Sequence, residues 1–135
     1  MATEAEIAYT AGLFDGEGSI TLTPIRSTRF PSPQVAVASN DREVLEWLKA
    51  QFGGSISTKQ PRRPTHSVSY DWRLTDRRAL GFLRQIRPYL KIQRKIKRVD
   101  LLLSEYVLCT PRNGRYTDEM RKAKQALVTR FFELA

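Results

Sequence analysis

The sequence predicts an α+β fold in a single domain, residues 1–135, with the order helix, two strands, helix, two strands and then three further helices. Three segments alternate apolar and polar residues with a period of two, which is typical of strands that bury one face. The segments between and after them repeat apolar residues at helical spacing and are bounded by capping residues, glycine or proline. A chain of 135 residues is long enough to bury one such core.

The first helix is expected over about Glu4–Asp15. Thr3 can cap its N-terminus, and Glu6, three residues later, completes the reciprocal arrangement of a capping box. Two strands follow, over about 19–23 and 34–39, and in both of them every second residue is apolar. The loop between the strands contains prolines and basic residues.

The second helix is expected to begin at Asn40, with Glu43 completing its cap, and to end at Gly53-Gly54. A third strand over about 55–60 and a fourth over about 67–74 come next. A turn rich in proline and arginine joins them. The first seven elements therefore follow the order αββαββα.

Three helices are expected in the last part of the chain. The first covers about 76–86 and stops at Pro88, and the second begins near Lys91. Thr117 caps the last helix. Its expected inward-facing residues are Met120, Ala123, Leu127, Phe131 and Leu134.

The charge of the chain is its first functional signal. Its 23 Lys and Arg against 14 Asp and Glu give a formal net charge of +9. Such an excess serves solubility or indicates a polyanionic partner, either nucleic acid or an anionic membrane. The membrane surface is disfavoured, because no segment pairs a basic face with exposed Trp or Phe in one long helix. The acidic start of the chain and its single cysteine, Cys109, favour an intracellular site, in a prokaryotic cytoplasm or an organelle.

The most informative segment lies at the end of the first expected helix. Ala8, Gly12 and Gly16 recur every four residues and leave one helix face nearly bare, so that another helix can approach closely. Interior glycines cost a helix about 1 kcal/mol each, and a close contact would offset that cost. Asp15 and Glu17 then lie at the helix C-terminus, where the helix dipole is already negative. A bound divalent cation would resolve this conflict.

The segment Thr10-Ala11-Gly12-Leu13-Phe14-Asp15-Gly16-Glu17-Gly18-Ser19 resembles the LAGLIDADG motif in its A-G-[LF]-[FIV]-D-G-E-G-S variant. The glycines and both acids fall in register, and Thr10 stands where the motif opens with leucine. The stretch 35–48 is similar to the second strand and following helix of that family, and 87–92 is similar to the segment ahead of its long helix. The resemblance covers about residues 6–108, so the last helix has no support from it.

This resemblance implies a homing endonuclease whose antiparallel, saddle-shaped sheet covers DNA and carries its helices on one face. One motif rather than two implies a homodimer that reads a roughly palindromic double-stranded site. The expected dimer interface contains Ala8, Gly12, Asp15 and Gly16. Glu17, with Gly16 beside it, would bind Mg²⁺ or another divalent cation such as Mn²⁺ or Ca²⁺ next to the scissile phosphates, for a staggered cut. Genes of this family lie in introns or encode inteins.

The supporting catalytic residues are less sharply defined by the resemblance. Relatives place a lysine just after the "Pro-Tyr-Leu" segment, where strict register puts Gln93. Lys91, Arg94 and Lys95 are close enough to replace it, and we favour Lys95. Their alternative role is a basic patch that contacts phosphates. Asn40 matches a polar position that orients water in relatives, and its other interpretation is the helix cap described above.

The polar strand faces and the two basic loops form the expected DNA-reading surface. A β-ribbon fits the major groove, where Arg, Lys and Gln side chains pair with base edges. Polar strand faces are often simply solvated, but the Arg and Lys residues in the adjoining turns favour DNA. The expected DNA-contacting residues are Ser19, Thr21, Thr23, Arg26, Arg29, Gln34, Ser57, Lys59, Arg62, Arg63, Ser69, Asp71, Arg73, Lys91 and Arg94.

Two other functions compete with cleavage. A chain with the same fold can bind without cutting, either as a transcription regulator or as a maturase that acts on RNA during intron splicing. A basic structural domain with no nucleic-acid partner is the third hypothesis. Retention of both acids of the motif favours the enzyme.

Overall fold

The computed structural model describes residues 2–24, 30–59 and 68–134. It has the predicted α+β fold with the predicted order of elements. The helices and strands are α1 (Glu4–Glu17), β1 (Gly18–Thr23), β2 (Ser32–Ser39), α2 (Arg42–Phe52), β3 (Ser55–Lys59), β4 (Ser69–Thr75), α3 (Asp76–Ile86), α4 (Gln93–Leu101) and α5 (Asp118–Glu133). Short helical turns connect α3 to α4 and α4 to α5.

The four strands form one antiparallel sheet in the order β1-β2-β4-β3. The register fixes which side chains share a face, because residues directly opposite one another point the same way. Ser19 of β1 lies opposite Ala36 of β2, which lies opposite Arg73 of β4, and Arg73 in turn lies opposite Ser55 of β3. One face of the sheet is therefore polar across all four strands.

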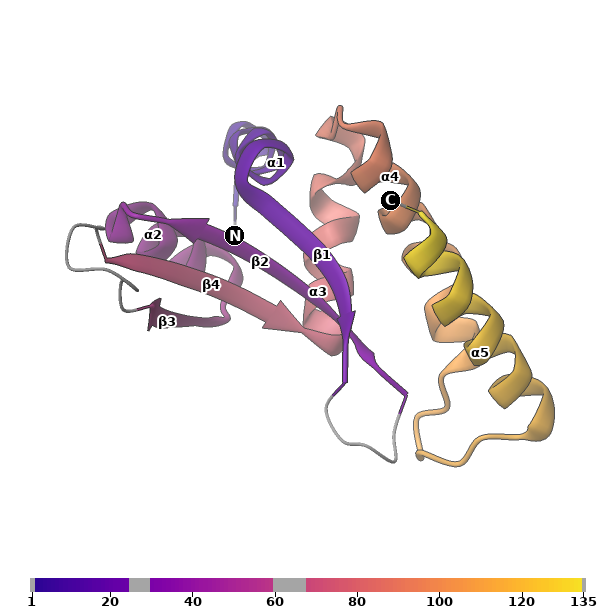
Figure 1. The fold of residues 1–135 in the computed structure, drawn as a ribbon. Coiled ribbons are helices and arrows are strands. Elements are labelled where there is room, and N and C mark those ends of the chain that lie inside the picture. Colours follow the sequence, from indigo (N-terminus) through magenta and orange to yellow (C-terminus); the bar gives the residue numbers. More distant parts are fainter. Residues whose placement is uncertain (1, 25–29, 60–67, 135) are drawn as a thin grey trace.

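The other face of the sheet forms the core together with the helices. Ile20, Val35, Trp72 and Leu74 are buried there, and Leu45 of α2 packs with them. In Figure 1, α2 and α3 lie behind the sheet, α1 lies above it, and no described helix crosses the face toward the viewer. The twisted sheet thus keeps one long face open. None of the helices in residues 2–24, 30–59 and 68–134 is long and apolar enough to span a membrane.

The ends of α1 and α2 are set by different local bonds. The capping box of α1 is confirmed: the Thr3 amide donates to Glu6 at 2.9 Å, and the Glu6 amide donates to the Thr3 hydroxyl at 3.2 Å. Asn40 does not cap α2, contrary to the expectation, because the helix begins at Arg42 behind Asp41. The hydroxyl of Ser39 accepts a hydrogen bond from the Asp41 amide at 3.0 Å and holds an extra turn ahead of the helix.

The glycine pair that ends α2 has a geometric reason. Gly53 and Gly54 both have positive φ, at 81° and 96°, a region that other residues rarely adopt. A Cβ on Gly54 would also lie 2.4 Å from the Arg73 carbonyl oxygen. The close approach lets the Trp72 indole donate to the Gly53 carbonyl at 2.8 Å. The predicted end of α2 at this pair is confirmed.

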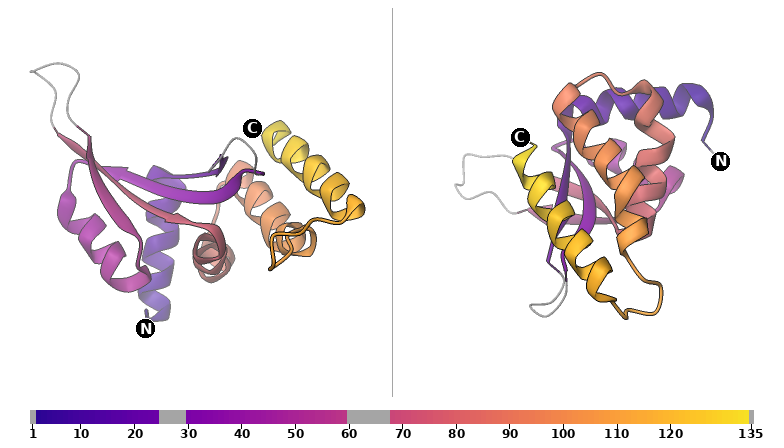
Figure 2. Two further views of the ribbon diagram at one scale, coloured as in Figure 1. Left: turned by 90° about the horizontal axis from the view of Figure 1, so that it is seen from below. Right: turned by 90° about the vertical axis from the view of Figure 1, so that its right-hand side faces the viewer.

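The last part of the chain packs beyond the β1 edge of the sheet, with α4 and α5 side by side (Figure 2). Leu127 and Phe131 of α5 are buried as predicted, and Thr117 caps the helix through the Met120 amide. Ala123 is exposed, so its predicted inward position is wrong. The neighbouring Lys124 is fully buried in its place.

Candidate active site and nucleic-acid interface

The candidate site is built around the C-terminal end of α1. Glu17 is the last residue of that helix, and Gly18 is the first residue of β1. Glu17 is exposed, and its carboxylate makes no hydrogen bond or ion pair with residues 2–24, 30–59 or 68–134. A carboxylate added to the negative end of a helix is unfavourable without a cation or donor. Glu17 therefore offers an accessible oxygen ligand on one side of the molecule.

Asp15 and Lys95 each place a charge of compensating sign at the end of a helix. The Asp15 carboxylate accepts from the Lys91 amide at 2.7 Å and from the Ile92 amide at 3.2 Å, directly ahead of α4. In return, the Lys95 ammonium donates to the Phe14 carbonyl at 2.8 Å and to the Asp15 carbonyl at 2.6 Å. An acid thus meets the positive end of α4, and a lysine meets the negative end of α1.

The groups around Lys95 shift its pKa in both directions, with a net lowering. Partial burial lowers the pKa of its ammonium, and the nearby Arg94 lowers it further. Asp15 and Glu17 act in the opposite direction and raise the pKa. The same carboxylates that define the site therefore favour the protonated lysine beside it.

The three motif glycines serve two different purposes. A Cβ on Gly12 or Gly16 would meet no heavy atom within 4 Å, so nothing in the described chain requires glycine at either position. A Cβ on Gly18 would lie 2.3 Å from the Phe14 ring. Gly18 is needed inside the chain, where the turn from α1 into β1 passes the ring. Gly12 and Gly16 have no such packing role within the described residues.

The face of α1 that carries these glycines has no partner among residues 2–24, 30–59 and 68–134. Gly12 and Gly16 are exposed, and Ala8 is half-buried on the same face. Tyr9 is 57% exposed and packs edge-on against Trp47 of α2 at a ring separation of 5.6 Å. Trp47 is only half-buried, whereas Trp72 is fully buried. An apolar and nearly flat helix surface thus borders the acidic end of α1.

Asn40 lies at the same end of the sheet as Glu17. Gly18, the first residue of β1, pairs with Val37, and β2 ends two residues later at Ser39. Asn40 is exposed directly after that strand. The register explains why a residue remote in sequence belongs to the neighbourhood of the α1 end, and it leaves the amide of Asn40 accessible.

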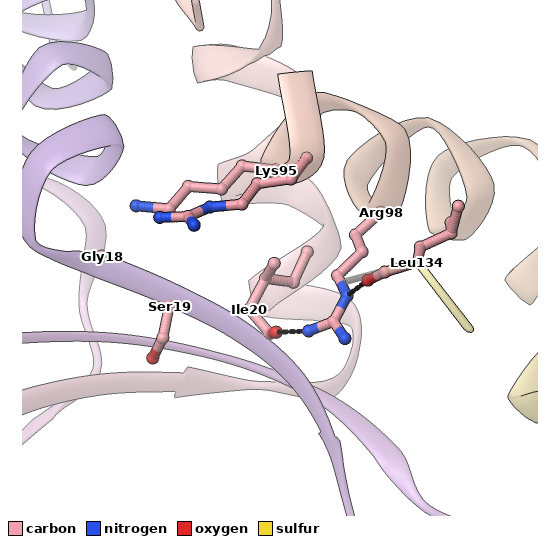
Figure 3. Close-up of a pocket in the computed structure, with 7 residues that line it drawn as sticks. Gly18, Ser19, Ile20, Lys95, Arg98 and Leu134 are labelled. Atoms are coloured by element: carbon pink, nitrogen blue, oxygen red, sulfur yellow. Dashed lines mark hydrogen bonds between the residues drawn. The ribbon is translucent and has the colours of Figure 1, made fainter. Parts of the chain in front are cut away.

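A pocket of about 190 Å³ opens between β1 and α4, next to the α1 end. Its walls come from the first residues of β1, from the first two turns of α4 and from Leu134 after α5. Figure 3 shows Lys95 extending past the pocket toward the start of β1 and Arg98 bridging Ile20 and Leu134. Three cations, Arg94, Lys95 and Arg98, line the pocket. Arg98 was not among the predicted residues, and its spacing of three from Lys95 on one helix was the only sequence signal for it.

The predicted polar strand residues do share a face of the sheet. The paired rows are Ser19, Ala36, Arg73 and Ser55, then Thr21, Gln34 and Thr75, and finally Ala38, Asp71 and Ser57, with Lys59 opposite Ser69. Thr23 follows two residues after Thr21 on β1 and points the same way. The sheet therefore presents a continuous row of hydroxyl, amide and cationic groups.

Asp71 is the exception on this face. It is only 4% exposed, with Lys59 at 3.0 Å and Arg73 at 3.1 Å from its carboxylate. The sequence predicts that Asp71 contacts DNA directly, but its Oδ2 oxygen is already engaged by two cations. Its carboxylate holds Lys59 and Arg73 side by side, and these two cations remain exposed on the surface.

Four predicted DNA contacts, Arg26, Arg29, Arg62 and Arg63, lie outside the described residues. Lys91 and Arg94, at the start of α4, are both exposed. No group of three or more His, Cys, Asp or Glu residues that could hold a metal ion occurs within the part of the chain that the structure describes. Among the described residues, Glu17 is thus not part of a larger cluster of side-chain metal ligands.

Comparison with known proteins identifies the fold. No protein-family model and no characterised protein matches the chain by sequence. In structure it is similar to the homing endonuclease I-CvuI in complex with its target in the presence of 2 mM Ca, with a TM-score of 0.73 and 16% identity over 98% of this chain and 83% of that one. The archaeal intron-encoded homing endonuclease I-Vdi141I, complexed with DNA, gives a TM-score of 0.64 and 16% identity over 98% of this chain and 85% of that one.

A third similar structure differs in length. The LAGLIDADG homing endonuclease I-SmaMI, bound to cleaved DNA, matches with a TM-score of 0.64 and 20% identity over 90% of this chain but only 42% of its own. The chain therefore has the fold of the LAGLIDADG homing endonucleases, and it spans less than half of I-SmaMI. The fold that the motif implied is confirmed.

Proposed function

We propose that this chain, with its LAGLIDADG homing-endonuclease fold, is a homodimeric, divalent-metal-dependent DNA endonuclease that makes a staggered cut in a long, roughly palindromic double-stranded site. One observation carries the proposal. Within the described residues, Glu17 is an accessible, unpaired carboxylate at the end of a helix whose glycine face is open. The carboxylate and the open face lie side by side, so a second copy docked on that face would bring two such carboxylates together.

The residues at the α1 end fit a magnesium site shared between two subunits and DNA. Mg²⁺ prefers oxygen ligands and is commonly held by one or two carboxylates together with substrate phosphates and water. One chain supplies Glu17 and, beside it, the backbone carbonyl of Gly16. When bound there, the ion would polarise the scissile phosphate and lower the pKa of the attacking water. The incomplete ligand set of a single chain is what such a shared site requires.

The chain's own residues would prepare this site in two ways. Asp15 and Lys95 join the end of α1 to the start of α4 and so hold Glu17 in place. The Lys95 ammonium has donated to two carbonyls and has a third N–H for a phosphate oxygen. Asn40, which is exposed at the same end of the sheet, would orient water. Lys95 and Asn40 are thus proposed as supporting catalytic residues beside Glu17.

The polar sheet face is proposed as the surface that reads DNA. Lys59, Arg73 and Gln34 can pair with base edges in the major groove, and the strand hydroxyls add shorter hydrogen bonds. Lys91 and Arg94 would contact phosphates near the site of cleavage. Because phosphate contacts release counterions, we expect affinity to fall steeply with salt, with a slope of about −0.9 per contacted phosphate.

The decisive experiment uses a plasmid that carries the DNA flanking the insertion point of the gene, joined as an uninterrupted site. We expect the protein to linearise it with Mg²⁺ and to leave 3′ overhangs, and we expect EDTA to stop the reaction. Tight, specific binding without cutting in Mg²⁺ or Mn²⁺ would instead support a DNA-binding regulator. Binding to intron RNA in preference to this DNA would support a maturase.

The proposed dimer predicts opposite results for two similar glycine substitutions. Gly12→Ala and Gly81→Ala each add a methyl group to a helix where the described chain leaves open space. Either change alone should stabilise its helix by about 1 kcal/mol. If α1 packs against a second α1, Gly12→Ala should instead weaken the dimer by roughly tenfold or more, because a methyl group at a close helix contact overpacks it.

Sedimentation equilibrium measures the dimer dissociation constants of the two variants and the parent protein. Gly81→Ala, in α3, is the matched control and should leave dimerisation unchanged. A parent protein that sediments as a monomer, both free and on DNA, would contradict the homodimer.

A further inference from the structure

The outer edge of β1 receives a side-chain hydrogen bond from Arg98 of α4. In the sheet of the described residues β1 is an edge strand next to β2, and the backbone groups on its free side need other partners. The Arg98 guanidinium donates from Nη1 to the Ile20 carbonyl at 3.2 Å. This contact supports β1 three residues after Glu17, at the point where a neighbouring strand would otherwise lie.

The same guanidinium binds the end of α5. Its Nε donates to the Leu134 carbonyl at 2.5 Å, just after the last turn of that helix. Its face lies over the Phe131 ring, with 4.5 Å between the guanidinium carbon and the ring centroid. A cation at a helix C-terminus and over an aromatic ring is favourable in both contacts. Arg98 therefore holds α5 and β1 together, as Figure 3 shows for Ile20 and Leu134.

Arg98 stands one helical turn after Lys95, on the same side of α4. Lys95 holds the carbonyls of Phe14 and Asp15, which precede Glu17, and Arg98 holds the carbonyl of Ile20, which follows it. Two cations of one helix thus bracket the short segment that carries Glu17.

We propose that Arg98 is a positioning residue for Glu17: together with Lys95 it clamps residues 14–20 onto α4 and so fixes where the Glu17 carboxylate points. The pocket of about 190 Å³ between β1 and α4 gives the segment room to move when this clamp is removed. The inference rests on the proposed nuclease function and names a residue that the motif does not contain.

A purely structural role for Arg98 makes a different prediction, and the chain offers a matched control. Arg130 pairs with Glu105 and also anchors α5, but it has no contact with β1 among the described residues. If Arg98 only secures α5, Arg98→Met and Arg130→Met should behave alike. If it positions Glu17, only Arg98→Met should change catalysis.

The test measures single-turnover cleavage, DNA affinity and magnesium dependence for both variants and for Arg98→Lys. We expect Arg98→Met to cut about 10- to 100-fold more slowly at saturating DNA, which is the scale of loss for a catalytic group misplaced by about 1 Å. It should also need more Mg²⁺ for half-maximal rate, while its DNA affinity stays within about threefold of the parent. Arg98→Lys keeps the charge but has one compact ammonium for two carbonyls, so its rate should be intermediate.

Hydrogen exchange of residues 14–22 adds a measurement that does not depend on activity. It should quicken in Arg98→Met and not in Arg130→Met. Equal rates and equal exchange in these two variants would overturn the inference. If the parent protein cuts no DNA, the proposed function fails, and the exchange comparison still decides whether the clamp exists.

Discussion

Lys95 is half-buried and Lys124 is fully buried, and their ammonium groups contact very different partners. Lys95, at the junction of α1 and α4, donates to two backbone carbonyls at a helix C-terminus, with Asp15 and Glu17 nearby. Lys124, in α5, is fully buried. Its ammonium donates to the Thr110 hydroxyl and lies 3.6 Å from the centroid of the Tyr106 ring.

The partners decide the charge of each lysine. Burial lowers the pKa of Lys95, but the two carboxylates oppose that shift. Burial lowers the pKa of Lys124 to about 8; Cys109 and Asp76 oppose the shift, and Arg77 adds to it. A hydroxyl and an aromatic ring compensate a buried cation less well than backbone carbonyls and carboxylates do. The carboxylates beside the proposed site thus favour the Lys95 cation, whereas the lysine beneath α5 loses its proton above about pH 8.

Substitution of Glu17, the carboxylate near Lys95, should have the largest effect, which is on the cleavage rate. Glu17→Gln removes the charge and keeps the shape, so we expect a cleavage rate lower by about 10³-fold or more, since a metal ligand contributes several kcal/mol to the transition state. DNA affinity should change little in a filter-binding assay. Glu133→Gln, an exposed acid at the end of α5, is the matched control. A Glu17→Gln protein that cuts at the parent rate would show that another acid binds the metal.

Removing the Lys95 ammonium should have the next largest effect. Lys95→Met leaves the Phe14 and Asp15 carbonyls without their charged donor, and we expect a loss of about 1–3 kcal/mol in the free energy of unfolding. The cleavage rate should fall by about 10- to 100-fold through the loosened α1 end. Urea unfolding and single-turnover kinetics measure the two losses. Lys97→Met, an exposed neighbour on α4, should show neither.

Substitution of Lys124 by methionine should change the free energy of unfolding in the opposite direction. Lys124→Met replaces a buried amine with an apolar chain of similar length, and the Thr110 hydroxyl keeps its own bond to the Tyr106 carbonyl at 2.5 Å. We expect a gain of about 1–2 kcal/mol in unfolding free energy at pH 7, since an uncompensated buried cation is removed. Thermal unfolding compares it with Lys122→Met, an exposed control. A destabilised Lys124→Met protein would show that the contact with the ring and hydroxyl is net favourable.

The pH dependence of stability should give the smallest effect per pH unit. The pKa of Lys124 is about 8 in the folded chain and 10.5 in the unfolded chain, so both states carry the proton below pH 8. Between these two values only the unfolded state binds it, and stability should rise with pH by at most about 1.4 kcal/mol per unit. Tyr106, Tyr116 and Cys109 have raised pKa values and act oppositely, at higher pH.

Subtracting the Lys124→Met profile from the parent profile isolates the lysine. The difference should be flat below pH 8 and should slope between pH 8 and 10.5. Parallel profiles over the whole range would indicate that the buried ammonium keeps its ordinary pKa.

Local pattern was sufficient for most of the fold. The Thr3 capping box, the Gly53-Gly54 end of α2 and the alternation in the strands were all predicted, because each depends on residues a few positions apart. The start of α2 was misplaced by two residues, since the Ser39 hydroxyl competes with Asn40 for the same turn. The inward face of α5 was shifted by one residue, because periodicity counts a lysine as polar wherever it lies.

The motif also located the candidate site, because its unusual glycines and acids are adjacent in the chain. Sequence alone determined that a carboxylate would end α1 and that one face of this helix would be bare. Only the tertiary structure decided that Asp15 binds the two amides ahead of α4, that Lys95 and Arg98 bracket Glu17 and that Asp71 holds two cations on the polar face. These contacts join residues far apart in the sequence, and a periodic pattern carries no information about which distant donor meets which acceptor.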